Sequence, residues 1–207
     1  MTLLDRRQID AQARGIAVLE TRRLVLRGAR LEDAKRVAAL VNDRRIAENT
    51  ARIPHPYTVD DATEWIRAVL SQSATSYVIT IAGDVIGACG LDGPSHYAPL
   101  SPAPPSPARG AGLGKGAAEG RQPAELGYWI GVPFWGCGYA TEAARGLIDH
   151  AFGGLGYEVL TASARVSNPA SRRVLEKCGF EWTGAGLCRI RAISSSVPVD
   201  RSRLERP

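Results

Sequence analysis

The chain has 207 residues, of which 44% are hydrophobic and 23% are charged, and its formal net charge is +5. These values are typical of a globular protein with a core, and they exclude a chain too polar to fold. The apolar stretches are too short to span a membrane, and the arginines are spread along the chain rather than gathered in one run. We therefore expect neither a membrane partner nor direct nucleic-acid binding.

The N-terminal segment, MTLLDRRQIDAQARG, carries both signs of charge and no apolar run. It lacks the pattern of a secretory signal, so we expect a flexible tail over residues 1–18. The chain has four cysteines without C-x-x-C spacing and three scattered histidines, so we expect no metal site. Reduced thiols and a cytoplasmic location are the default for such cysteine usage.

The first part of the chain alternates between strand and helix patterns. Apolar residues recur at helical spacing in LEDAKRVAALVNDRRIAEN, and Thr58 and Asp61 have the spacing of a capping box at the start of the next helix. Two β-branched runs joined at Gly83 and Asp84 indicate a hairpin. These patterns predict a strand over 19–30, helices over 31–49 and 58–73, and a hairpin over 76–92.

Residues 93–123 differ in kind, because proline, glycine, alanine and serine dominate and no apolar period survives. This composition predicts a low-complexity insert. Its GLGKGA fragment resembles part of a phosphate-binding P-loop, but no serine or threonine follows Lys115, and Arg109 stands where that motif begins with glycine. The place of the insert directly after the hairpin leaves two interpretations: it covers the acceptor side of a site, or it has no catalytic part.

The second part of the chain returns to strong periodicity. It predicts a strand over 124–132, a helix over 138–156, a strand over 158–166, a short helix over 168–180 that Gly179 closes, and weaker strands over 187–193 and 197–206. The order of strand, two helices, hairpin, strand, helix, strand, helix and strand predicts a mixed α/β sheet. We expect a single domain over 19–205, interrupted by the insert.

The stretch FWGCGYATEA, residues 134–143, leads from a strand through a tight turn into a helix. The first N–H groups of a helix lack internal partners, and glycines such as Gly136 and Gly138 let a phosphate approach them closely. The turn therefore suits a pyrophosphate, although a turn that merely needs positive φ is the alternative. A dinucleotide fingerprint would need a third glycine where Thr141 stands, and a triphosphate loop would need the Lys-Ser/Thr pair.

Two motifs together, ELGYWIGVPFWGCGYATEAARGLIDHAF and ARVSNPASRRVLEKCGF, resemble the GNAT superfamily of N-acetyltransferases, most of all its Rim-type branch of ribosomal-protein N-terminal acetyltransferases. The resemblance implies a mixed sheet with two splayed central strands, acetyl-CoA as co-substrate, and no metal. It implies a primary amine as acceptor, with the α-amine of a ribosomal or other protein N-terminus favoured over a small-molecule amine such as an amino acid, polyamine or antibiotic. Two alternatives outside this class are a non-catalytic CoA-binding regulator and a nucleotide-binding protein. A monomer or a homodimer is expected.

The resemblance also implies which residues hold the cofactor. Backbone amides of the glycine turn would bind the pyrophosphate, and those residues are Gly136, Cys137, Gly138, Tyr139, Ala140 and Thr141. Trp135 stands where the general pattern has arginine or glutamine, and the backbone of Ile130 and Val132 would pair with the pantetheine arm. Asn168 would contact that arm, although as Asn-Pro it is equally suited to cap the helix that follows.

Two residues are candidates for proton transfer. Ser171 would lie near the sulfur and protonate the departing thiolate, as the resemblance implies. Glu125, at the start of the strand before the turn, is the candidate base, directly or through a water, with an ordinary strand-edge carboxylate as the alternative. Ser163 stands where some relatives carry a glutamate, and it cannot act as a base.

For five other residues we expect structural rather than catalytic roles. Glu142 is expected to face outward, toward Arg145. Cys137 has no histidine nearby in the sequence, so covalent catalysis is not expected. Tyr128 and Trp129 are assigned to the wall and core of the site, and His55 to the surface.

Overall fold

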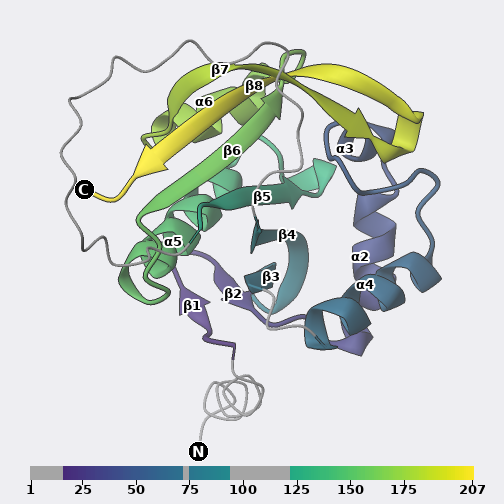
Figure 1. Cartoon of the computed structure of the whole chain (residues 1–207). Coiled ribbons are helices and arrows are strands. Elements are labelled where there is room, and N and C mark those ends of the chain that lie inside the picture. Colours follow the sequence, from purple (N-terminus) through teal and green to yellow (C-terminus); the bar gives the residue numbers. More distant parts are fainter. Residues whose placement is uncertain (1–15, 72–74, 94–121) are drawn as a thin grey trace, which may run out of the picture.

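The computed structural model describes residues 16–71, 75–93 and 122–207. Within these residues, eight strands form one sheet with the order β1-β2-β3-β4-β5-β6-β8-β7 (Figure 1). The strands are β1 (Leu19–Glu20), β2 (Val25–Arg27), β3 (Thr75–Ile81), β4 (Asp84–Asp92), β5 (Ala124–Ile130), β6 (Val159–Arg165), β7 (Glu181–Ile190) and β8 (Ser195–Glu205). The helices are α2 (Ala34–Val41), α3 (Arg44–Ala47), α4 (Val59–Ser71), α5 (Tyr139–Gly153) and α6 (Pro169–Lys177), with 3-10 turns η1 (Leu31–Asp33), η2 (Val132–Phe134) and η3 (Arg191–Ile193). The expected mixed α/β fold is confirmed.

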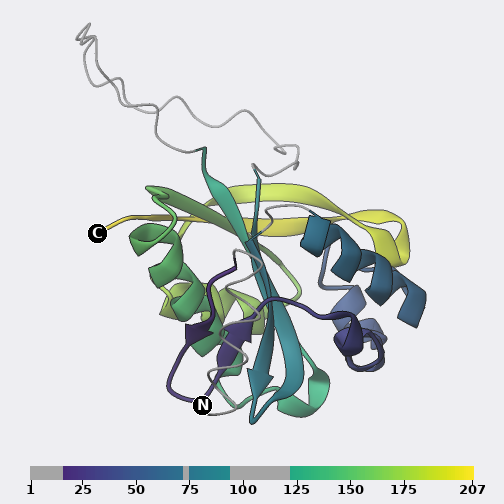
Figure 2. The same ribbon diagram turned by 90° about the horizontal axis from the view of Figure 1, so that it is seen from below.

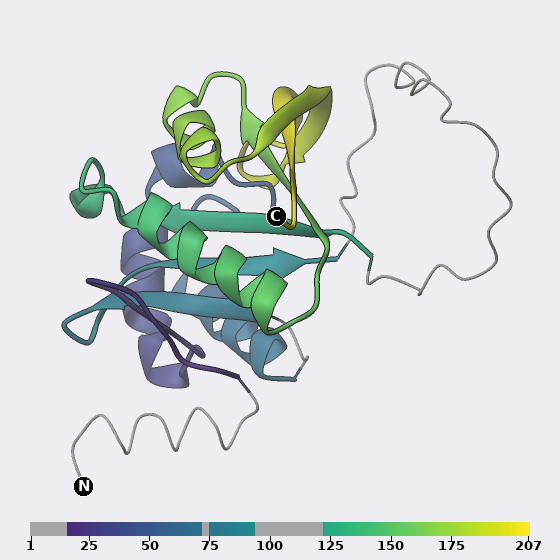
Figure 3. The same cartoon turned by 90° about the vertical axis from the view of Figure 1, so that its left-hand side faces the viewer.

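Helices cover both faces of the sheet. Figure 2 shows α5 and α6 on one side and α2 and α4 on the other, and Figure 3 shows α5 crossing the strands with α2 and α4 behind them. Neighbouring side chains of a strand point to opposite faces, so Ile79 packs into the core under α5 while Val78 packs into the core under α2 and α4. The sheet is thus buried on both sides through its centre.

The two central strands β5 and β6 separate soon after they meet. β5 pairs with β4 along its length, from Asp92 opposite Glu125 to Gly87 opposite Ile130. Its parallel pairing with β6 is limited to two positions, of which Glu125 opposite Thr161 is the last. β6 continues instead beside β8, so a gap opens between β5 and β6 (Figure 1). These are the splayed central strands that the resemblance implies.

The predicted helix over 31–49 is wrong in its continuity, because the chain breaks at Asn42 and Asp43. The Asn42 amide oxygen accepts a hydrogen bond from the backbone N–H of Tyr57 at 2.9 Å, and Asp43 caps α3 by accepting from the backbone N–H of Arg45 at 2.9 Å. Short polar side chains that bond to nearby backbone compete with a helix in this way. The result is three short pieces, η1, α2 and α3.

The predicted opening strand over 19–30 is also divided. β1 folds back antiparallel on β2, with Leu19 opposite Leu26. Thr21 closes the turn, because its backbone N–H donates to the Leu24 carbonyl at 2.9 Å and its hydroxyl accepts from the Leu24 N–H at 3.0 Å. A single strand becomes a small hairpin at the edge of the sheet.

Other helix and strand boundaries lie at or near the residues that predict them. The capping box is confirmed, since Thr58 and Asp61 exchange hydrogen bonds at the start of α4. The hairpin of β3 and β4 is confirmed, but its turn is centred on Ala82 and Gly83, both with positive φ, rather than on Gly83 and Asp84. The last two strands are longer than predicted, and η3 replaces the end of the first.

Most of two predicted segments lies outside the described residues. They are the tail over 1–18 and the insert over 93–123. Within the part of the chain that the structure describes, no helix has the length and apolar character needed to cross a membrane.

Candidate active site

The glycine turn has the backbone form that an anion site needs. Gly136 and Gly138 have φ angles of 76° and 79°, in the left-handed region, and Gly138 is the N-cap of α5. Glu142 makes the first intrahelical bond of α5, from its N–H to the Gly138 carbonyl at 3.1 Å. The amides of Tyr139 to Thr141 therefore precede the helical ladder and point out of the helix end, where they suit a phosphate.

An arginine from the first hairpin braces this turn. The Arg23 Nη2 donates to the Cys137 carbonyl at 3.1 Å, and the guanidinium lies 4.6 Å from the centre of the Tyr139 ring. Arg23 Nε also forms an ion pair with Glu142 at 2.7 Å. The β1–β2 turn thereby fixes the position of the glycine turn from outside.

The predicted approach of Glu142 to Arg145 is wrong. The Glu142 carboxylate accepts from the Thr21 hydroxyl and from the backbone N–H of Arg23, each at 2.7 Å, whereas Arg145 donates to the Lys177 carbonyl. Burial raises the pKa of Glu142, but the hydrogen bonds from Thr21 and Arg23 outweigh burial and leave it lowered. Its partners lie about 120 positions away in the chain, so helical spacing could not reveal them.

The end of β5 presents backbone groups to the gap. The Gly131 N–H donates to the Ile86 carbonyl on β4 at 2.8 Å. Because strand residues alternate in the direction of their backbone groups, Tyr128 and Ile130 point theirs away from β4, toward the gap. These amides are placed to meet an extended ligand arm.

Trp135 ties down the same strand end. Its indole N–H donates to the Ile130 carbonyl at 2.6 Å, and its backbone N–H donates to the Val132 carbonyl at 3.1 Å. Trp135 thus orders the turn through its indole rather than through a charge. Because the carbonyls of Ile130 and Val132 already accept these hydrogen bonds, the groups that a ligand arm would use are the amides of Ile130 and Val132 and the backbone of Tyr128.

Ser171 lies beside the hydroxyl of Tyr128, a residue predicted only to form the wall or core of the site. The Tyr128 Oη is 2.9 Å from the Ser171 Oγ and donates to the Ser171 carbonyl at 3.2 Å. Burial raises the pKa of Tyr128 to about 12, although the hydrogen bond with Ser171 lowers it. The tyrosine therefore stays protonated near neutral pH. Asn168 acts here as the N-cap of α6, accepting from the Ser171 N–H at 3.2 Å.

Glu125 lies where β5 and β6 part, in a group of interacting polar side chains. It is directly opposite Asp92 on β4, and Asp92 forms an ion pair with Arg52. Burial raises the pKa of the Glu125 carboxyl, a hydrogen bond with Ser163 lowers it, the neighbouring Asp92 raises it again, and the net direction is upward. Ser163, the departure from the glutamate of some relatives, thus becomes a partner of the candidate base.

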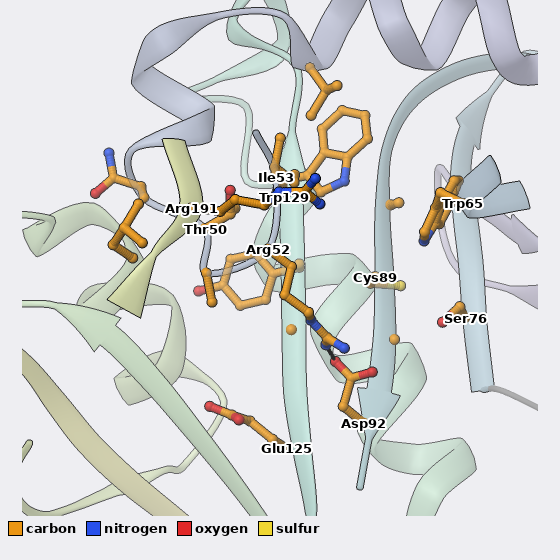
Figure 4. A pocket seen from close by; sticks show the side chains of 18 of the residues that line it. Thr50, Arg52, Ile53, Trp65, Ser76, Cys89, Asp92, Glu125, Trp129 and Arg191 are labelled. Carbon is orange, nitrogen blue, oxygen red and sulfur yellow. Dashed lines mark hydrogen bonds and ion pairs between the residues drawn. The ribbon is translucent and has the colours of Figure 1, made fainter. Parts of the chain in front are cut away.

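A cavity of about 620 Å³ joins these groups (Figure 4). It lies between the segment 49–54, α4, β4 and β5, and it reaches the gap between the central strands. Glu125, Ser163, Tyr128 and Ser171 all line it. The glycine turn, Asn168 and His55 do not, so the cavity contains the candidates for proton transfer but not the residues predicted to bind the pyrophosphate.

The Cys137 thiol contacts a residue of its own turn. Cys137 is exposed, and its thiol lies 3.6 Å from the Trp135 carbonyl. No cluster of three or more histidine, cysteine, aspartate or glutamate residues that could hold a metal ion occurs among residues 16–71, 75–93 and 122–207.

Comparison with known proteins agrees with this geometry. The protein N-acetyltransferase p20 of Bacillus licheniformis, itself uncharacterized, is 27% identical over 172 residues, which cover 80% of this chain and 83% of that protein. The solved structure of RimL, a ribosomal L7/L12 alpha-N-protein acetyltransferase in complex with coenzyme A, matches with a TM-score of 0.68 at 16% identity, covering 91% of this chain and 97% of RimL. The microcin C7 self immunity acetyltransferase MccE, in complex with acetyl-CoA and AMP, matches with a TM-score of 0.66 at 17% identity, covering 89% and 93% of the two chains. At these identities the two structures show a shared fold.

The family model of the acetyltransferase (GNAT) domain matches residues 23–181. That range contains the glycine turn, both splayed strands and the Tyr128–Ser171 pair. The chain therefore belongs to the GNAT acetyltransferase family and is an acyltransferase.

Proposed function

We propose that this enzyme transfers the acetyl group of acetyl-CoA to a protein N-terminal α-amine, by direct attack within a ternary complex. The observation that carries the proposal is the gap between β5 and β6, because the cavity with the Glu125 carboxylate reaches it and the glycine turn follows the end of β5. The complexes of RimL with coenzyme A and of MccE with acetyl-CoA support the choice of cofactor.

The glycine turn and the strand end would hold the two parts of acetyl-CoA. The amides of residues 136–141 would bind the pyrophosphate, and the backbone of Tyr128 and the amide of Ile130 would pair with the pantetheine arm. In this arrangement the thioester would lie in the gap, near the Tyr128–Ser171 pair.

The acceptor amine must lose a proton as the new C–N bond forms. An α-amine with a pKa of 7.7–8.0 is about 10–20% neutral at pH 7, whereas a lysine amine with a pKa near 10.4 is almost wholly charged. Glu125 would take the proton, directly or through a water, and its raised pKa makes it a better base than an ordinary carboxylate. A modest base of this kind suits an α-amine better than a lysine.

The C–S bond then breaks, and the departing thiolate needs a proton. The Ser171 hydroxyl would supply it, with the Tyr128 hydroxyl hydrogen-bonded to the same oxygen to stabilise the charge that develops there. Both groups are neutral donors before the reaction, so neither repels the negative charge of CoA.

A small-molecule amine is the second candidate acceptor within this class, and a CoA-binding regulator is the candidate outside it. The first test is thermal unfolding with acetyl-CoA, CoA, NAD and ATP in parallel, since a ligand that binds only the folded state raises the Tm. Thiol release is then measured with unblocked peptides, their N-acetylated forms, and small amines. We expect a shift with the CoA ligands and turnover with unblocked peptides. A shift without turnover on any amine would favour the regulator, and a shift only with NAD or ATP would contradict the CoA site.

A further inference from the structure

A second, open pocket of about 420 Å³ adjoins the cavity on its outer side. It is lined by Ala51, Arg52, Arg189, Arg191 and Ser194. Three of these residues, Ala51, Arg52 and Arg191, also line the larger cavity, so the two spaces are continuous. Among the described residues that line the outer pocket, three are arginines and none is acidic. We call Arg52, Arg189 and Arg191 the arginine rim.

The backbone beneath the arginine rim is fixed by packing from two segments. The Arg191 N–H donates to the Ala51 carbonyl at 3.0 Å, which joins the loop after α3 to η3. Ala51, Ala192 and Ile193 also pack against a small core at the far end of β7 and β8. The guanidinium groups are exposed, but the chain that carries them is held in place.

The charge of the rim is only partly neutralised. Arg52 pairs with Asp92, and Arg191 lies close enough to Asp61 to lower the pKa of that carboxyl, after the larger effect of its hydrogen bonds with Thr58. Neither Arg189 nor Arg191 forms an ion pair with any residue that the structure describes. Positive charge therefore faces solvent at the mouth of the cavity.

The side of the cavity beside the gap carries the Glu125 carboxylate. Glu125 lies opposite Asp92, whose charge is paired with Arg52. In Figure 4, Arg191 lies above Glu125, and Arg52, at an intermediate height, reaches toward Asp92. An acceptor that is positive at its reacting amine and negative further along matches this separation of charge, and one with the opposite order does not.

We infer that the arginine rim binds an acidic group of the acceptor, so that the preferred acceptors are protein N-termini with Asp or Glu directly after the first residue. This inference rests on the proposed function. An extended peptide advances about 3.3 Å per residue, and a cavity of 620 Å³ is roughly 9 Å across, so it accommodates the first two or three residues. An acidic side chain on the second or third residue would then reach the rim while the α-amine stays near Glu125.

The test compares peptides that share their first residue and differ only in the charge that follows: Ser-Asp-Asp-Ala, Ser-Asn-Asn-Ala and Ser-Lys-Lys-Ala, each extended by the same neutral tail. Thiol release gives kcat/KM for the wild type and for the double variant Arg189→Gln/Arg191→Gln. The control is Arg203→Gln, because Arg203 is an exposed arginine on β8 that lines neither pocket.

We expect the wild type to favour the acidic over the neutral peptide by at least about 10-fold, mostly through KM, and to disfavour the basic one. The double variant should reduce this ratio to within about 2-fold, and the control should keep it. Raising the salt concentration should shrink the ratio in the wild type, because exposed charges are screened.

Each other result has a distinct meaning. Equal kcat/KM for acidic and neutral peptides, or a preference that survives in the double variant, overturns the inference and leaves the proposed function standing. A higher kcat/KM for free glutamate or aspartate than for any peptide overturns the protein acceptor. Absence of turnover with every peptide contradicts the proposed function, and the inference falls with it.

Discussion

At the scale of single residues, the raised pKa of Glu125 lowers the stability of the folded protein at the pH where the residue would act as a base. Its pKa is raised in the folded protein above the ordinary value of 4.5, with burial as the largest cause. The folded state therefore holds this proton more tightly than the unfolded chain, and the free energy of unfolding falls as the pH rises from 4.5 through the folded pKa. Above that window the wild type carries a partly buried charge that a glutamine would not.

We therefore expect Glu125→Gln to raise the Tm at pH 8 and to lower kcat/KM by about 100-fold, the lower end for a general base, because part of an α-amine is already neutral. The gain in Tm should shrink as the pH falls and vanish below about 4.5. Glu181→Gln, an exposed carboxylate on β7, is the control for both measurements. An unchanged kcat/KM would remove Glu125 from the chemistry.

The Tyr128–Ser171 pair predicts coupled effects on the chemical step. We expect Ser171→Ala to lower kcat by about 100-fold, while the Kd for acetyl-CoA changes by less than about 3-fold. Tyr128→Phe should lower kcat less, and the double variant should lose less than the product of the single effects, since the two hydroxyls share one hydrogen bond. Single-turnover kinetics and titration of acetyl-CoA binding measure the two quantities separately. Equal losses in kcat and binding would contradict the role of Ser171 in protonating the thiolate.

At the level of elements, the turn before α5 makes a prediction with a matched control within the same chain. Gly136 and Gly156 have φ angles of 76° and 70°, and a methyl group added at either meets no atom within 4 Å. Gly136 lies before α5 and Gly156 after it. Alanine at either position should cost about 1–2 kcal/mol of stability through the left-handed backbone.

Only Gly136→Ala should also weaken acetyl-CoA binding, by about 10-fold or more, because Gly136 belongs to the turn proposed to hold the pyrophosphate. Thermal unfolding and acetyl-CoA titration of both variants test this pair. Similar losses of affinity in the two variants would show that backbone strain, and not the position of a phosphate, is responsible.

The same elements show which features the sequence could predict. The glycine turn, the Thr58 cap and the β3–β4 hairpin follow from residues a few positions apart, and all three are present. The break at Asn42 and Asp43 is also encoded locally, in side chains that bond to nearby backbone, but the apolar stripe on both sides masked it. The partners of the site were not predictable in this way: Glu142 meets Arg23, Tyr128 meets Ser171, and Glu125 meets Ser163 across separations of 38 or more positions. Such contacts depend on the sheet order, which periodicity does not encode.

At the level of the whole molecule, the two strands that flank residues 94–121 pair directly with each other. β4 and β5 pair up to Asp92 opposite Glu125, so the chain leaves and re-enters the sheet at adjacent positions. We expect a short turn in place of 94–121 to keep the fold and to stabilise it by about 1–2 kcal/mol, from loop-closure entropy alone. Denaturant unfolding measures this, and a loss of stability would show that the segment adds contacts.

The same replacement tests whether the segment takes part in the reaction. Asp92 and Glu125 are the residues nearest its two ends that line the cavity, so a change in kcat/KM for peptides at unchanged stability would place the segment over the acceptor side. Unchanged kinetics would remove it from the mechanism.

The early parting of β5 and β6 has a consequence for inhibitor design. Because the proposed cofactor side and the acceptor side both adjoin that gap, a single molecule could occupy both. An example is a bisubstrate conjugate in which a short acyl bridge joins the sulfur of CoA to the α-amine of an acidic peptide. Such a molecule would lie in the gap and contact the glycine turn and the arginine rim together. Its two halves would bind as one ligand at high effective concentration, so such a conjugate should bind far more tightly than either CoA or the peptide alone.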